Sequence, residues 1–340
     1  MYKKIFISVF KLFAILVILL VIILLSVLYI NINIYLNELR HLDISKIYVK
    51  DSTKIYDNNN LLITELGTEK RDVISYDEIS ENMINAIVAI EDAKFFKHQG
   101  IDYYRIIGAL IENLKTKSYK EGASTLTQQL VKLSFLSNEK SLERKLKEIF
   151  ISIELENQLS KKDIIETYLN RVLFGGRIYG VEKASKYYFD KPAKELNYEE
   201  AAMLAGMVQS PNRFNPHINP ELTKLRQIMV LQAMYDNNYI TQKEFMIGKN
   251  RPITELVVKP KEYKDFNKYN EYIDYVIHEL IHKYKLDPFN DSLHVITNLN
   301  LDIQDIIYEI ENDKKLHPND KTQTGIVVLE TNTGKIIGIG

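Results

Sequence analysis

The segment Gly122–Lys132 reads GASTLTQQLVK, and it decides the fold of the central part of the chain because it predicts where a helix begins. Thr125 and Gln128 have the spacing of a capping box, so we expect a helix to start after Thr125. At about 100° per residue, Ser124, Gln128 and Lys132 share one face. Unpaired N–H groups at the helix start, together with this polar face, suit an anion. The opposite face carries the residues expected to pack: Leu126, Leu130 and Leu133.

Length and composition limit the functions that the chain can have. A chain of 340 residues has room for about two domains. The formal net charge of −1 provides no general basic field, so nucleic acid is not expected as a partner. The sequence contains no cysteine, which excludes disulfides and cysteine-based zinc or thiol chemistry but fixes no compartment.

The N-terminus predicts a membrane anchor. The uncharged apolar run Leu12–Ile30, LFAILVILLVIILLSVLYI, has the length of a helix that spans a bilayer. Lys3, Lys4 and Lys11 precede it, which places the N-terminus in the cytoplasm and the rest of the chain outside. The following NINIYLNELR has no small-residue cleavage site, so we expect an uncleaved single-pass anchor, with a cleaved signal as the alternative.

The pattern changes along the chain predict four regions. Residues 1–30 form the cytoplasmic tip and the anchor, and residues 31–75 form a stalk with a short strand pair joined by a turn at Asp57–Asn60. Residues 76–250 are helical almost throughout, and 251–340 comprise a linker helix and β-strands that end in a hairpin. Because a lone hairpin is marginal in water, we expect a further domain beyond Gly340.

Glu91 lies on a predicted helix that Ser80 caps. It continues the apolar stripe of Ile84, Ile87 and Val88. A carboxylate in that position is either the salt-bridged end of a helix or a proton-transferring group held in a cleft. Taken alone, the residues favour the salt-bridged helix end.

A second cluster lies on a predicted helix further along. Arg144 and Lys145 are four and three residues before Glu148, so the three side chains meet on one helix face. The apolar stripe beside them is predicted to be Leu142, Leu146, Ile149 and Ile153. Ordinary ion pairs on a solvated face are the better explanation of this cluster when it is considered alone.

Five motifs in series favour a functional role for Glu91 and for the Arg144–Lys145–Glu148 cluster over ordinary ion pairs. EDAKFFKHQGID (91–102), GASTLTQQLVK (122–132) and RKLKE (144–148) are followed by IIETYLNRVLFGGRIYGVEKASKYYFDK (164–191) and LNYEEAAMLAGMVQSPNRFNP (196–216). The series resembles the peptidoglycan glycosyltransferase domain of class A penicillin-binding proteins, over roughly residues 76–220. Two positions depart from the usual pattern, Ala123 where a second glycine is common and Leu133 where an asparagine is common.

The resemblance implies a mainly α, lysozyme-like helical domain behind the transmembrane helix, acting on lipid II. Glu91 would be the general base for the acceptor 4-hydroxyl, with inversion at the donor anomeric carbon and release of undecaprenyl pyrophosphate. Glu148 would orient the basic groups or the donor phosphate, and Asp92 and His98 would brace the first motif. The pyrophosphate would be bound by Ser124, Gln128, Lys132, Arg144 and Lys145.

Cofactors and partners also follow from the resemblance. No cofactor or metal is required by it, although a divalent cation, Mg or Mn, at the donor pyrophosphate is left open. The implied partners are lipid II, the growing glycan strand, the membrane, and cell-wall synthesis or division proteins. The apolar stripe from Ile106 to Leu114 would dip into the bilayer, with Tyr103 and Tyr104 at the interface, unless it packs as core.

Rival functions are indicated by other features. HELIH (278–282) fits the zinc-protease pattern, with Glu309 or Glu311 as a distant ligand, and SNEK (137–140) is a formal Ser-x-x-Lys. The stretch 324–340 resembles the opening of a transpeptidase domain whose nucleophile motifs would lie beyond Gly340, so we expect no cross-linking by this chain. A scaffold with a decayed site and a lytic hydrolase are the remaining alternatives.

Overall fold

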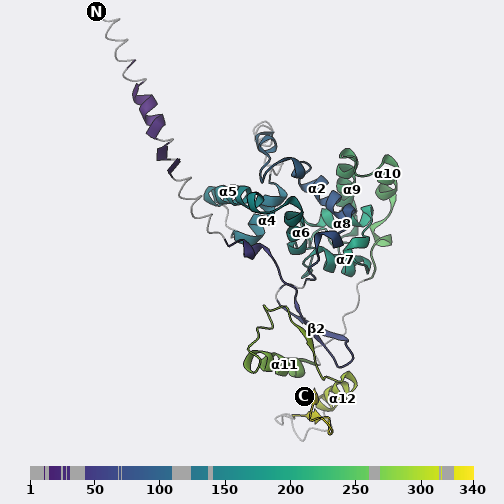
Figure 1. Cartoon of the computed structure of the whole chain (residues 1–340). Helices are drawn as coiled ribbons and strands as arrows, with labels where there is room; N and C mark the ends of the chain where they lie inside the picture. Colours follow the sequence, from purple (N-terminus) through teal and green to yellow (C-terminus); the bar gives the residue numbers. More distant parts are fainter. Residues whose placement is uncertain are drawn as a thin grey trace, which may run out of the picture. The chain divides into compact units, whose positions relative to one another are not determined.

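The computed structural model describes residues 43–67, 69, 71–108, 124–136, 141–259, 269–313, 315 and 325–340, together with residues 11, 15–23, 26–27 and 29–30 near the N-terminus. It is mainly helical with a few short strands, as expected (Figure 1). The chain divides into two compact units. The first contains Met1–Tyr48 and Phe96–Ile164, and the second contains Val49–Phe95 and Ile165–Gly340.

Near the N-terminus, the described residues between 11 and 30 are helical. Within the part of the chain that the structure describes, no helix is both long and apolar enough to cross a membrane. The expected anchor, Leu12–Ile30, includes residues outside that part.

In the first unit, helix α4 (Leu126–Phe135) packs against α5 (Leu142–Gln158) and against the 3-10 turn η1 (Ile44–Ile47). Leu126 and Leu130 are fully buried, as the helical wheel predicts. Leu133 is 48% exposed, so its assignment to the packed face is wrong. It lies in the last turn of the helix, beyond the buried first turns that hold the contacts.

The buried face of α5 also differs from the predicted stripe. Glu148, Ile151, Ser152 and Leu155 are buried, whereas Leu146 is 51% exposed. The buried line advances by three or four residues, as a helix requires, but it passes through a carboxylate. A hydrophobic pattern cannot identify such a line, because it counts Glu148 as a surface residue.

Gly100 fixes the approach of the first motif to both helices of the first unit. Its φ of +82° is a conformation that other residues rarely adopt, and a Cβ there would lie 2.6 Å from the Ser152 carbonyl oxygen of α5. The Gly100 carbonyl oxygen accepts a hydrogen bond of 2.7 Å from the Thr125 hydroxyl at the start of α4. The glycine is therefore required by both backbone conformation and close packing.

In the second unit, α2 (Glu81–Glu91) packs against α8 (Tyr198–Met207) and α9 (Pro220–Asp236). Ser80 caps α2, as expected, by accepting a hydrogen bond from the Asn82 N–H. Every residue of α8 from Glu199 to Met207 is buried, so this helix forms the centre of the helical core. The other helices and turns of this unit described here are η2 (Tyr76–Glu78), α7 (Val181–Phe189), η4 (Ala193–Glu195), α10 (Gln242–Asn250) and η5 (Ile253–Glu255). Two further elements, η3 (Phe95–Lys97) and α6 (Lys161–Arg171), contain residues of both units.

A small β-sheet in the second unit joins two distant parts of the sequence. The predicted strand pair is present as β1 (Thr53–Tyr56) and β2 (Leu62–Leu66), paired antiparallel. The Asp57 carboxylate closes the turn by accepting the N–H groups of Asn59 and Leu61. In addition, β1 pairs in parallel with β3 (His294–Ile296), which the sequence pattern did not indicate.

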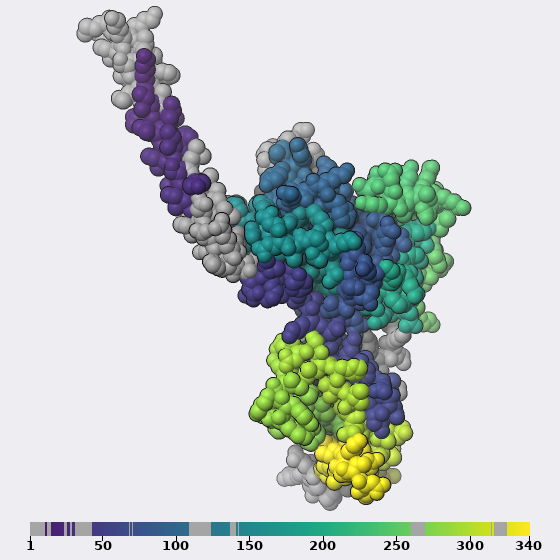
Figure 2. All heavy atoms as spheres, in the orientation of Figure 1, coloured from purple at the N-terminus to yellow at the C-terminus, as the bar shows by residue number. Residues whose placement is uncertain are grey.

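Helix α11 (Asn270–His282) packs on this sheet through an apolar core that includes Ile55, Ile63, Tyr272 and Val276. The expected C-terminal hairpin is present as β4 (Val327–Leu329) and β5 (Ile336–Ile339). It packs beside α12 (Leu301–Asn312), and its Ile336 and Ile339 extend the same core. In Figure 2 the yellow atoms of this hairpin adjoin the yellow-green atoms of the preceding segment.

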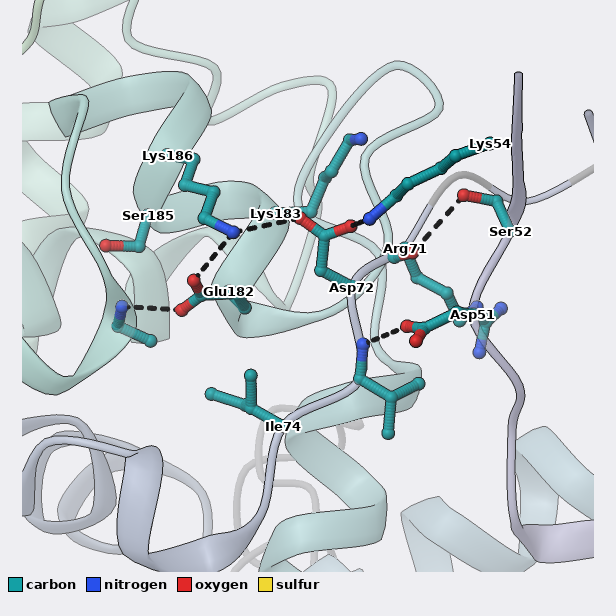
Figure 3. A network of polar contacts seen from close by, with 12 residues as sticks. Asp51, Ser52, Lys54, Arg71, Asp72, Ile74, Glu182, Lys183, Ser185 and Lys186 are labelled. Atoms are coloured by element: carbon teal, nitrogen blue, oxygen red, sulfur yellow. Dashed lines mark hydrogen bonds and ion pairs between the residues drawn. The ribbon is translucent and has the colours of Figure 1, made fainter. Parts of the chain in front are cut away.

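A chain of alternating charges connects the β1–β2 hairpin region to α7 (Figure 3). Asp72 accepts from Lys54 at 2.5 Å and from Lys186 at 3.2 Å. Lys186 also pairs with Glu182 at 2.9 Å, and Glu182 accepts the Ala193 N–H at 2.7 Å. Burial alone would raise the pKa of Asp72, but Lys54, Lys183 and Lys186 outweigh it, so the pKa lies below its ordinary value.

Candidate active site

Glu91 is the last residue of α2, and its side chain is 17% exposed. The preceding residues Ile87 and Val88 are buried, so the stripe predicted from the sequence leads into the core and ends at a partly accessible carboxylate. Such a group can accept a proton from a molecule that reaches it from solvent. The structure thus places Glu91 where either of its sequence-based interpretations would require it.

The cation that faces Glu91 comes from α9. Arg226 Nη2 lies 3.9 Å from Glu91 Oε1, and Arg226 Nε donates to the Gly206 carbonyl oxygen near the end of α8 at 3.3 Å. Burial lowers the pKa of the Arg226 guanidinium, while the charge of Glu91 opposes that shift. Sequence reasoning missed Arg226, because α9 lies beyond the five motifs and nothing local links the two residues.

The charge of Glu91 also changes the pKa of Tyr168, which lies on α6. Its side chain is fully buried, and burial, followed by the Glu91 charge, raises the pKa of Tyr168 well above its ordinary value. The phenol is therefore neutral throughout the physiological range. Asp92, which follows Glu91, is 1% exposed, and its backbone carbonyl oxygen accepts the Phe95 N–H at 2.8 Å. The bracing role of its side chain stays a prediction.

In the first unit, the structure brings together four predicted site residues at the start of α4 and on α5. Lys145 Nζ donates to the Ser124 hydroxyl at 2.9 Å and also pairs with the Glu148 carboxylate. Arg144 Nη1 lies 3.6 Å from the second oxygen of Glu148. Glu148 is 3% exposed, and a buried charge must be paired. Two cations on the preceding turn of its own helix compensate it.

Buried donors in this cluster remain available. Arg144 Nε and Gln128 Nε2 are buried and have no hydrogen-bond partner among the described residues, and Arg144 Nη1 makes an ion pair with Glu148 but no hydrogen bond. Buried polar atoms without partners are rare, since each costs about 1–3 kcal/mol. Several unused donors around a positively charged cluster can bind an anion with several oxygen atoms.

Gln128 and Lys132 occupy different environments, although the wheel placed them on one face. Gln128 is 1% exposed, and its side-chain oxygen accepts the Thr125 N–H at 2.9 Å, completing the predicted capping box. Lys132 is exposed in the last turn of α4. His98 is half-buried after η3 in the first unit.

Among the described residues, the first-unit cluster offers a divalent cation one carboxylate, Glu148, whose two oxygens face Lys145 and Arg144. Magnesium is usually held by one or two carboxylates together with substrate phosphates and water, so the cation left open for the donor pyrophosphate stays a prediction. The described part of the chain contains no group of three or more His, Asp or Glu side chains that could hold a metal ion. The rings of His278 and His282 in HELIH are tilted against each other, with centroids 4.2 Å apart.

Several sequence-based assignments lie outside the described residues. These are the Ser-x-x-Lys at 137–140, Ala123, and the part of the apolar stripe from Leu110 to Leu114. The described part of that stripe, 103–108, is helical. Within it, Tyr103, Tyr104 and Ile107 are 62%, 82% and 56% exposed, so these side chains are not core.

Comparison with known proteins gives a consistent result. Residues 59–235 match the family described as Transglycosylase. The chain is 40% identical over 303 residues to penicillin-binding protein 1A/1B of Bacillus subtilis, covering 88% of this chain and 33% of that protein. It is 34% identical over 312 residues to penicillin-binding protein 1A of Streptococcus oralis, covering 89% of this chain and 48% of that protein.

A crystal structure of penicillin-binding protein 1A from Haemophilus influenzae has a TM-score of 0.43 at 20% identity, covering 74% of this chain and 27% of that chain. This structural likeness is too low to support an argument about fold. The chain spans a third to a half of the length of the two curated relatives above.

Proposed function

This chain belongs to the transglycosylase family carried by class A penicillin-binding proteins, and from this premise we propose that it polymerises lipid II into glycan strands. Glycosyl transfer in peptidoglycan synthesis is the activity of that family. The substrate, the stereochemistry and the residue roles below are proposals, each supported by a feature of one unit.

Glu91 is assigned the role of general base. It removes the proton from the 4-hydroxyl of the acceptor sugar, and that oxygen attacks the donor anomeric carbon as the bond from this carbon to the pyrophosphate oxygen breaks. A single displacement of this kind inverts the configuration at the anomeric carbon. The supporting observation is a carboxylate at the end of a buried stripe that is still 17% exposed.

The α4–α5 cluster is assigned to the departing pyrophosphate. Lys145 and Arg144 supply positive charge, and Ser124 and Gln128 supply neutral donors, as the buried unpartnered atoms of Arg144 and Gln128 indicate. Fixed donors aimed at developing charge are usually the largest contribution to catalysis. Glu148 orients the two cations from their own helix, and Lys132, which is exposed, contributes a longer-range charge.

The catalytic domain is proposed to act at the outer face of the cytoplasmic membrane. The apolar N-terminal run provides an anchor. The exposed Tyr103, Tyr104 and Ile107 provide a second attachment in the first unit, because aromatic and aliphatic side chains partition to the membrane interface. The growing glycan strand and proteins of cell-wall synthesis or division are the proposed partners.

The observation that carries the proposal is the Ser124–Lys145–Glu148 constellation, because neutral donors and oriented cations match a pyrophosphate and not a neutral glycan alone. The test supplies lipid II to the full chain in detergent. Polymer together with undecaprenyl pyrophosphate supports the proposal. Cleavage of preformed glycan strands without polymerisation would indicate a lytic hydrolase, and binding without turnover would indicate a scaffold.

A further inference from the structure

Glu91 occupies an electrostatically unfavourable position for an anion. It is the last residue of α2, and the C-terminal end of a helix carries partial negative charge. A general base must be anionic before it can accept a proton. Another group is therefore needed to stabilise the charge of Glu91 and to fix its orientation.

Arg226 has the geometry for this task. Its Nη2 atom faces Glu91 Oε1 at 3.9 Å, and its Nε atom donates to the Gly206 carbonyl oxygen at 3.3 Å. The side chain is only 10% exposed, so solvent weakens the attraction less than at a surface. Gly206 gives the stem room, because a Cβ there would lie 3.0 Å from Arg226 Cγ.

On the basis of the function proposed above, we propose that Arg226 is a positioning residue that holds the Glu91 carboxylate in the orientation that proton removal requires. The carbonyl of α8 fixes one nitrogen of the guanidinium, so another nitrogen is presented to the end of α2. Arginine suits this role because it stays charged when buried and makes several directed hydrogen bonds from one planar group.

Neither Tyr168 nor the acidic residues of α8 can replace Arg226. Tyr168, on α6, has its pKa raised by burial and by the Glu91 charge, and remains neutral. The acidic residues of α8 are engaged elsewhere, since Glu199 pairs with Arg251 at 3.2 Å and Glu200 pairs with Lys191 at 2.6 Å. Arg226, on α9, therefore supplies the positive charge that the structure places against Glu91.

The test compares Arg226→Met, Arg226→Lys and the control Arg251→Met in the full chain, with lipid II as substrate. Arg251→Met also removes an arginine that pairs with an acidic residue in this helical core, but away from Glu91. Methionine keeps much of the apolar stem, and lysine keeps the charge but cannot contact both Gly206 and Glu91 as arginine does. For each variant, kcat, KM and the midpoint of urea unfolding are measured.

We expect Arg226→Met to lower kcat by about 10–10²-fold with little change in KM, because a misplaced catalytic group affects the chemical step. Arg226→Lys restores kcat only in part, because lysine cannot contact both Gly206 and Glu91. Arg251→Met leaves kcat and KM unchanged.

The inference is overturned if Arg226→Met keeps the wild-type kcat, or if its kcat falls only in step with the midpoint of urea unfolding. If Arg226→Met does not fold, Arg226→Lys decides the matter: unchanged kcat rejects the positioning role, and reduced kcat with unchanged KM supports it. Failure of the wild-type chain to polymerise lipid II would reject the proposed function instead, so the two outcomes are distinguishable.

Discussion

The two glutamates assigned to the site are held in opposite ways. Glu148 has a side chain that is 4% exposed, and its cations, Lys145 and Arg144, come from the preceding turn of the same helix. Glu91 is 17% exposed at the end of its helix, and the arginine that faces it comes from α9 at 3.9 Å. A carboxylate that is closely paired on both oxygens can orient cations but is poorly placed to receive a proton. The partly accessible Glu91 is the better base.

The largest expected effect distinguishes the two carboxylates by activity. Glu91→Gln keeps the size of the side chain but removes the proton acceptor, so polymerisation should fall by about 10²–10⁴-fold, the usual contribution of general-base catalysis. Stability should change little, because the group is partly exposed. Turnover of lipid II and urea unfolding measure the two quantities. Near-normal turnover would remove Glu91 from the mechanism.

The second largest effect on turnover is expected when one cation of the Glu148 cluster is removed. Lys145→Ala should reduce turnover by about 10²–10³-fold, the cost of removing one fixed donor to developing charge. Lys147→Ala is the matched control on the same helix, because Lys147 pairs with the exposed Glu143 at 2.9 Å. Steady-state kinetics of both variants give the comparison. Equal losses in the two variants would mean that α5 needs only general positive charge.

A smaller effect concerns the stability that Glu148 provides. Glu148→Gln leaves Arg144 and Lys145 without their counter-charge, and we expect a loss of roughly 1–3 kcal/mol in the free energy of unfolding. Glu143→Gln, whose side chain is 61% exposed, should change it by no more than about 0.5 kcal/mol. Urea titration of both variants measures this difference. Equal values would show that the burial of Glu148 has no energetic consequence.

The Asp72 network offers a carboxylate with a structural role and no proposed part in the chemistry. Because the pKa of Asp72 in the folded chain is below its ordinary value of 3.8, its contribution to stability is present above pH 3.8 and is lost as the pH falls through the lower folded value. Asp72→Asn should therefore be less stable than the wild type at neutral pH, with the difference shrinking below pH 3.8. Urea unfolding at several pH values measures it, and a difference independent of pH would contradict this account.

The features that were predictable from sequence depend on neighbours along the chain. The capping box of Thr125 and Gln128, the Ser80 cap and the Lys145–Glu148 pair all follow from spacings of two to four residues, and all are present. The turn at Asp57–Asn60 was predictable because the residue types specify it. Local chemistry therefore identified one carboxylate together with its cations.

The features that sequence reasoning missed depend on tertiary packing. Arg226 meets Glu91 only because α2, α8 and α9 pack together, and β1 meets β3 only after the whole helical segment has been built between them. The error at Leu146 has a similar cause, because a paired carboxylate, Glu148, occupies the buried line of α5. A single sequence carries no signal for such long-range pairs.

The division of labour between Glu91 and the α4–α5 cluster is tested most directly by binding of the leaving group. Affinity for undecaprenyl pyrophosphate in detergent is measured for the full chain, for Glu91→Gln and for Lys145→Ala. The account predicts that Glu91→Gln binds like the wild type although it does not turn over. It also predicts that Lys145→Ala binds about tenfold or more weakly, as expected for the loss of one charge-assisted hydrogen bond. Weakened binding in Glu91→Gln with unchanged binding in Lys145→Ala would contradict it.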